Sequence, residues 1–95
     1  MRIRTSPGEI LLEEFMKPLD LSGSEVARQL KVPANRINDI VRGRREVSAD
    51  TALRLARYFG TTARFWLNAQ TAHDLSKAEQ EGAARIAREV RPRAA

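Results

Sequence analysis

Cysteine is missing from this chain of 95 residues, and histidine occurs once, at His73. Without cysteine the chain has no disulfide framework, no zinc finger and no thiol nucleophile. His73 has no second metal-binding residue one helical turn away, so we expect no metal site there. The sequence also lacks a glycine-rich phosphate loop and carboxylates clustered at metal-ligand spacing. These absences argue against an enzyme, and they indicate neither a metal nor another cofactor.

Long apolar runs are missing as well. Arg2 and Arg4 near the start are not followed by one, so we expect neither a signal peptide nor a membrane span. A cytoplasmic location without membrane contact is the default expectation. The length fits one domain, whose core is small and whose stability is correspondingly modest. Dimerisation is a common way for so small a domain to bury more surface.

The formal net charge is +5, and the charges are unevenly distributed along the chain. Residues 31–45 hold five basic residues and one acidic residue, a net charge of +4. Residues 9–25 hold five acidic residues and one basic residue, a net charge of −4. A concentrated basic patch is typical of proteins that bind phosphates, although a face exposed only to solvent explains the charge equally well.

Helix signals dominate the sequence and predict an all-α fold of five helices. The first covers about residues 7–16, the fourth residues 48–60, and the fifth continues from residue 63 to at least residue 75. Residues 79–95 are rich in Ala, Glu and Arg, which predicts a short helical tail, frayed or separate and mobile toward its end. We therefore divide the chain into a domain of residues 1–78 and a tail of residues 79–95.

The second and third helices form a helix-turn-helix. Ser22 and Glu25 form an S-x-x-E capping box at the start of the second helix. Pro33 disfavours a helical residue before it, so this helix ends at a turn made by residues 31–33. The third helix covers residues 34–42 and is followed by a C-cap glycine. A connection this short forces the two helices into a tight elbow.

The third helix presents polar side chains to the outside. Its inward stripe of isoleucines leaves six residues facing outward: Ala34, Asn35, Arg36, Asn38, Asp39 and Arg42. Asn pairs bidentately with adenine and Arg with guanine, so we expect bases to be read by Asn35, Arg36 and Asn38. Phosphates are expected to be held by Ser24, Arg42, Arg44 and Arg45. This pattern predicts double-stranded DNA as a partner, and a purely structural helix hairpin is the alternative explanation.

Three segments resemble the HigA-type antitoxins, which belong to the Xre group of phage-repressor-like helix-turn-helix proteins. They are S-P-G-E-I-L-L-E-E-F-M-K-P-L-D-L-S, V-P-A-N-R-I-N-D-I-V-R-G-R-R and S-A-D-T-A-L-R-L-A-R-Y-F-G-T-T-A-R-F-W-L-N-A-Q. The resemblance covers about residues 6–75 and implies a five-helix phage-repressor-like domain with residues 34–42 as recognition helix. It also implies a nucleoid-associated homodimer that binds a palindromic operator and represses its own operon. As an antitoxin, it would neutralise a toxin related to RelE, a ribosome-dependent RNA-cleaving enzyme.

The resemblance adds Ser22, Lys31 and Pro33 to the expected DNA-binding residues, and it exposes two departures. Gly23 stands where the family usually has a Gln that touches a phosphate or braces a base-reading side chain. Gly23 has no side chain for either task, which leaves phosphate binding to Ser22 and Ser24. Lys31 stands where the turn usually has Gly, and a left-handed conformation there costs roughly 1 kcal/mol.

The fifth helix has two possible roles. Phe65, Trp66, Ala69 and His73 are the residues that we expect in a dimer interface, although the same stretch closes the core equally well. A dimer is attractive because paired recognition helices must sit about one helical turn of DNA apart, ~34 Å.

Several alternatives remain open at this point. The acidic residues Glu9, Glu13 and Glu14 suit a contact with a basic toxin, but a solvated first helix explains them as well. A stand-alone repressor without a toxin has the same DNA-binding surface. A protein-interaction module whose basic patch binds an acidic protein is the third possibility.

Overall fold

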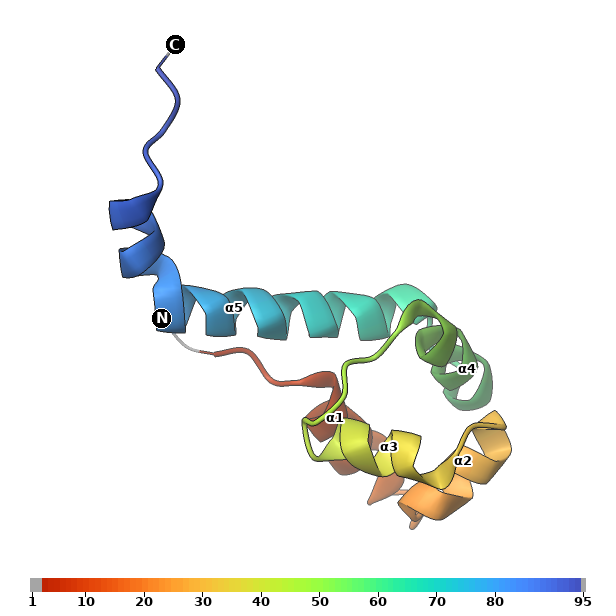
Figure 1. The fold of residues 1–95 in the computed structure, drawn as a ribbon. Coiled ribbons are helices and arrows are strands. Elements are labelled where there is room, and N and C mark those ends of the chain that lie inside the picture. The colour runs from red at the N-terminus through yellow and green to blue at the C-terminus, as the bar shows by residue number, and fades with distance from the viewer. Residues whose placement is uncertain (1–2, 95) are drawn as a thin grey trace.

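The computed structural model describes residues 3–94, which form helices and no strand. In chain order the elements are α1 (Pro7–Ile10), η1 (Leu11–Met16), α2 (Gly23–Leu30), α3 (Ala34–Val41), α4 (Ala49–Phe59) and α5 (Ala63–Glu89). Figure 1 shows α5 along one side of the domain, α1, α2 and α3 on the opposite side, and α4 closing one end. The predicted all-α class is confirmed.

The first predicted helix has the expected extent but two kinds of winding. Ser6 caps α1, and its Oγ accepts a hydrogen bond from the N–H of Glu9 at 3.2 Å. From Leu11 onward the chain continues as the π-helix η1, in which the N–H of Lys17 donates to the carbonyl five residues back at 2.9 Å. This wider turn brings both Leu11 and Met16 into the core, with exposed fractions of 0% and 4%.

An aromatic cluster holds α5 against η1. Trp66 has an exposed fraction of 0%, and its ring centroid lies 5.2 Å from that of Phe15. Phe15 in turn lies 5.0 Å from Phe59 of α4. The indole N–H of Trp66 donates to Oγ1 of Thr61 at 2.8 Å. The expectation that Trp66 belongs to a dimer interface is therefore corrected, because its buried side chain has no exposed surface to offer a partner.

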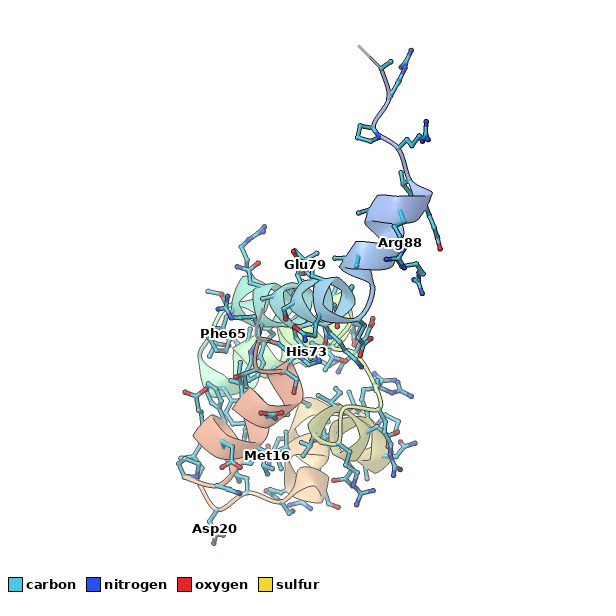
Figure 2. The ribbon with its side chains drawn as sticks, turned by 90° about the vertical axis from the view of Figure 1, so that its left-hand side faces the viewer. Met16, Asp20, Phe65, His73, Glu79 and Arg88 are labelled. Atoms are coloured by element: carbon cyan, nitrogen blue, oxygen red, sulfur yellow. The ribbon has the colours of Figure 1, made fainter. Side chains whose placement is uncertain are left out.

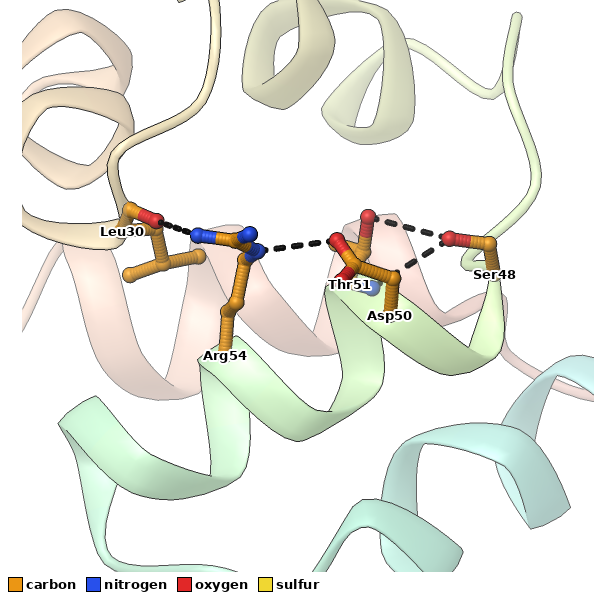
Figure 3. A network of polar contacts seen from close by, with 5 residues as sticks. All are labelled: Leu30, Ser48, Asp50, Thr51 and Arg54. Carbon is orange, nitrogen blue, oxygen red and sulfur yellow. Dashed lines mark hydrogen bonds and ion pairs between the residues drawn. The ribbon is translucent and has the colours of Figure 1, made fainter.

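Arg54 connects α4 to the end of α2 (Figure 3). Its Nη1 donates to the carbonyl oxygen of Leu30 at 2.9 Å, and its Nε donates to Oδ2 of Asp50 at 2.8 Å. The last carbonyls of a helix have no intrahelical partner, so the guanidinium satisfies one of them at the end of α2. Ser48 caps α4 as predicted, because its Oγ accepts from the N–H of Thr51 at 3.2 Å. As a result, α4 fixes the position of α2 just before the turn.

The last helix, α5, has 27 residues, and residues 79–89 continue it. The predicted helical tail is thus a continuation of α5 and not a separate helix, and the boundary expected at residue 78 falls inside α5. Figures 1 and 2 show the last turns bending away from the body between Glu79 and Arg88. Gly82 lies in this stretch, where a glycine weakens the helix. Despite the length of α5, no helix within residues 3–94 is apolar enough over a sufficient length to cross a membrane.

Residues 3–6 lie against α5, where two side chains hold the backbone of Arg4. The N–H of Arg4 donates to Oγ of Ser76 at 2.8 Å, and Nδ1 of His73 lies 2.7 Å from the carbonyl oxygen of Arg4. Ser76 itself donates to the carbonyl of His73 at 3.0 Å. His73, expected at a dimer interface, thus already uses one ring nitrogen within the monomer. Within residues 3–94, no group of three or more His, Asp or Glu side chains is arranged to hold a metal ion.

Trp66 and Phe65 are neighbours on α5, but only Trp66 is buried, so substitutions of the two test its place in the core. Replacing Trp66→Ala leaves a cavity beside Phe15 and should lower the free energy of unfolding by about 3–5 kcal/mol. Replacing Phe65→Ala should cost clearly less, because the exposed fraction of Phe65 is 40%. Urea denaturation followed by circular dichroism, at equal protein concentration, measures both. Equal losses would contradict the core position of Trp66.

Candidate nucleic-acid interface

Ser22 begins α2 as predicted, but only half of the capping box forms. The Oγ of Ser22 accepts from the N–H of Glu25 at 3.1 Å. The carboxylate of Glu25 turns away to pair with Arg28 and to accept from Nε2 of Gln29 at 3.3 Å. It therefore does not reach back to the start of the helix. The first backbone N–H groups of α2 and the positive end of its dipole are left to attract an anion such as a phosphate.

The turn between α2 and α3 depends on Lys31 in the left-handed conformation. Its φ and ψ angles are 61° and 44°, which confirms the conformation considered from the sequence. The N–H of Lys31 donates to the carbonyl of Arg28 at 3.2 Å, and the N–H of Val32 donates to the carbonyl of Ala27 at 3.0 Å. These bonds close the end of α2 and offset the roughly 1 kcal/mol strain. The side chain of Lys31 is left exposed.

Two buried isoleucines and a glycine fix the position and the end of α3. Ile37 and Ile40 have exposed fractions of 0% and 2%. Gly43 has a φ of 75°, and the N–H of Arg44 donates to the carbonyl of Asp39 at 2.8 Å. This left-handed cap ends α3 and turns the chain. Arg44 and Arg45, both exposed, therefore lie directly beyond the end of the helix.

None of the predicted DNA-binding residues is buried. Nine of them are exposed: Ser22, Ser24, Lys31, Pro33, Ala34, Asn35, Arg42, Arg44 and Arg45. Three on the flanks of α3 are half-buried: Arg36, Asn38 and Asp39. They come from the start of α2, the turn, α3 and the loop after it, and α2 packs directly against α3. The structure thus assembles these residues on adjoining elements, and their individual roles stay predictions.

Arg36 carries a buried donor without a partner. Its Nε is the one buried side-chain nitrogen or oxygen within residues 3–94 that has no hydrogen-bond partner. Leaving such a donor unpaired costs about 1–3 kcal/mol. A rotation of the side chain that brings Nε to an acceptor would remove this cost.

Gln70 is a residue of this region that the sequence reasoning missed. Its Oε1 accepts from the backbone N–H of Val47 at 2.8 Å, and its Nε2 donates to Oδ1 of Asp74 at 2.9 Å. Val47 is buried and directly follows the basic loop that contains Arg44 and Arg45. The loop is therefore fastened to α5, 23 residues further along the chain. A contact of this separation leaves no local signal in the sequence.

Apolar side chains remain exposed on α4 and α5. Phe65 is 40% exposed, and its dimer-interface companions Ala69 and His73 are half-buried. Figure 2 shows Phe65 and His73 on the same stretch of α5. Four other large apolar side chains are exposed on these two helices, and a fifth directly follows α5, but none was predicted in the interface: Leu53, Tyr58, Leu75, Ile86 and Val90. Exposed apolar side chains thus occur at more positions along α4 and α5 than the predicted interface contains.

The acidic residues lie on α1 and η1, away from the basic loop in the sequence and on a different element. Glu9, Glu13 and Glu14 are all exposed. Nζ of Lys17 pairs with Oε1 of Glu13 at 2.8 Å, so that among these three acids only Glu13 has an ion-pair partner. The negative charges therefore lie on α1 and η1, whereas most positive charges of the candidate interface lie in the turn before α3 and the loop after it.

Comparison with known proteins gives consistent matches. A family model described as helix-turn-helix matches residues 12–66. Virulence-associated protein I of Dichelobacter nodosus is 59% identical over 75 residues, which are 79% of this chain and 69% of that protein. The structure of Pseudomonas aeruginosa antitoxin HigA with the higBA promoter is 46% identical, with a TM-score of 0.89 over 96% of this chain and 98% of that chain. The antitoxin GraA in complex with its operator is 47% identical, with a TM-score of 0.91 over 100% of this chain and 95% of that chain.

The bond between Gln70 and Val47 predicts how the basic loop is held. Replacing Gln70→Ala removes the acceptor of the Val47 amide, so that amide should exchange its hydrogen at least several-fold faster while amides inside α3 keep their protection. The matched control is Asp74→Ala, which leaves the Val47 bond in place. Amide hydrogen exchange by NMR measures the effect. Equal exchange of Val47 in both variants and the unchanged protein would show that Gln70 does not hold the loop.

Proposed function

Because the chain belongs to the helix-turn-helix family, we propose that it is the antitoxin of a type II toxin–antitoxin system that represses its own operon. The family consists of DNA-binding regulators and is not enzymatic. The resemblance to HigA-type antitoxins noted in the sequence is confirmed. The observation that carries the proposal is the group of exposed arginines that follows α3, Arg42, Arg44 and Arg45, in a chain that is 46% and 47% identical to two antitoxins solved with DNA.

In this proposal α3 enters the major groove of a palindromic operator. Asn35, Arg36 and Asn38 read base edges, since amide and guanidinium groups match the donor and acceptor pattern of adenine and guanine. Two groups of exposed residues hold the phosphate backbone and set the register of the protein on the DNA. They are Ser22, Ser24 and Lys31, which precede α3 in the chain, and Arg42, Arg44 and Arg45, which follow it. The protein then acts in the cytoplasm, on the DNA of the nucleoid.

A homodimer follows from the palindromic operator, because each half-site needs its own recognition helix about 34 Å from the other. We place the interface on α5 around Phe65, Ala69 and His73, and we leave out Trp66 because it is buried within the monomer. Apolar burial of this kind also adds stability to a domain of only 95 residues.

The second partner is a basic toxin related to RelE, bound through α1 and η1. RNA-cleaving enzymes attract a polyanion, and a surface that suits RNA also attracts exposed carboxylates. Glu9, Glu13 and Glu14 are exposed in this region, and we choose Glu9 and Glu14 as the contact residues because Glu13 is already paired with Lys17. This arrangement leaves α3 free for the operator while a toxin is bound.

Two arginine variants test the DNA contacts. Arg36→Ala should cost about 1–3 kcal/mol of binding free energy and relax discrimination at one base pair. Arg44→Ala should weaken binding to all sequences equally and reduce the slope of log K against log salt by about 0.9 per lost phosphate contact. Fluorescence anisotropy on the promoter of the chain's own operon, at several salt concentrations, measures both. Binding without any salt dependence would contradict the operator contact.

Charge reversal tests the toxin surface. The unchanged chain should co-purify with the product of the adjacent gene, and Glu9→Lys combined with Glu14→Lys should abolish this capture while leaving promoter affinity unchanged. Glu81→Lys, at an exposed acid of α5, is the matched control and should retain capture. Promoter binding without any captured toxin would identify a stand-alone repressor instead. Failure to bind either the promoter or the toxin would favour a protein-interaction module.

A further inference from the structure

Gly23 leaves a space at the start of α2 that the side chain of Asn38 fills. A Cβ atom built on Gly23 would overlap Oδ1 of Asn38 and would lie 3.2 Å from its Cγ and 3.8 Å from its Nδ2. These three atoms are the nearest neighbours of that position from outside the helix. The carboxamide of Asn38 therefore rests directly on the backbone of Gly23.

The other glycines of the domain have different reasons to lack a side chain. A Cβ on Gly8 would overlap the backbone carbonyl of Ile40, and Gly43 and Gly60 have φ angles of 75° and 74°. Gly23 has neither a positive φ nor a neighbouring backbone against its Cα. Its missing side chain thus serves one contact, the one with Asn38.

This contact controls the orientation of a recognition group. Asn reads adenine with an acceptor and a donor on one planar carboxamide, so both atoms must face the base edge together. The Oδ1 end of Asn38 is seated against α2 and the Nδ2 end is the farther one. A rotation about either side-chain torsion displaces both atoms from where they lie in this structure.

We propose that Gly23 is a positioning residue for DNA recognition, which sets the base pair that Asn38 discriminates by seating its carboxamide against α2. The inference rests on the proposed function, since it needs a specific operator. It deepens that function by assigning part of the specificity to a residue that has no side chain of its own.

A double-mutant cycle tests the coupling. The variants are Gly23→Ala, Asn38→Ala and the double variant, each titrated against the operator and against operators with every base pair substituted singly. A bidentate Asn contact discriminates by about 5- to 150-fold, so Gly23→Ala should reduce or redirect that ratio at one base pair of each half-site. With Asn38→Ala already present, Gly23→Ala should change nothing further, because no carboxamide is left to displace.

Gly82→Ala is the matched control for introducing a methyl group into a helix. A Cβ there meets Nη2 of Arg85 at 3.5 Å and Cδ1 of Ile86 at 4.0 Å, which are ordinary contacts. Both alanine variants should melt at or above the temperature of the unchanged protein, because alanine favours helix more than glycine does. Only Gly23→Ala should alter base discrimination.

A measurement on the free protein separates this inference from the proposed function. NMR coupling constants should show a changed χ1 distribution of Asn38 in Gly23→Ala and an unchanged one in Gly82→Ala. The inference is wrong if Asn38 keeps its conformation, if the two substitutions are additive, or if Gly23→Ala weakens all operators equally. If Asn38 moves but the unchanged protein binds no promoter DNA, the proposed function is wrong, and so is the role of Gly23 in specificity. The steric contact between Gly23 and Asn38 is then still correct.

Discussion

The packing of Trp66 against Phe15 fixes α5 across the back of the domain, and the other long-range contacts depend on that position. From α5, Gln70 reaches the backbone beside the basic loop at Val47, and Ser76 reaches the backbone of Arg4. Each of these hydrogen bonds is worth only about 0.5–1.5 kcal/mol. The buried indole is worth several times as much, so it decides where the helix lies and the hydrogen bonds then decide which loops follow it. The basic loop that contains Arg44 and Arg45 is held in this indirect way, through the bond between Val47 and Gln70.

Side-chain caps and left-handed residues define most of the helix ends in this domain. Ser22, Ser48 and Thr62 each accept a backbone N–H at the start of a helix, and left-handed residues close three of the helix ends. Gly43 and Gly60 adopt that conformation without strain, whereas Lys31 does not. The strain at Lys31 is accepted in the turn that sets the angle between α2 and α3. In the proposed function the exposed ammonium group of Lys31 is the reason, because a glycine in the same place would offer no charge to a phosphate.

The local parts of the fold could be predicted from the sequence, because Ser caps, Gly stops and Pro33 act within one helical turn. The parts that were missed are set by distant residues or by competition. The π-helix η1 follows from burying Leu11 and Met16 together, and Glu25 prefers Arg28 to the start of its own helix. Gln70 and the burial of Trp66 depend on which segment packs against α5. Of the candidate site, the sequence predicted that the polar residues of α3 face outward, and the structure leaves Asn35 exposed but the other three half-buried. The seating of Asn38 on Gly23 was not predictable, since the two residues belong to different helices.

The helices α1 and α3 are in direct contact, although they serve different partners in the proposed function. Gly8 of α1 lies so close to the backbone of Ile40 in α3 that no Cβ fits between them. Backbones in contact do not slide past each other as flexible side chains do, because a packed interior resists small displacements. A partner that shifts α1 must therefore either carry α3 with it or break this contact. In the proposed function, a toxin that shifts α1 would therefore change the affinity of α3 for DNA, and by linkage DNA would change the affinity for that toxin by the same factor.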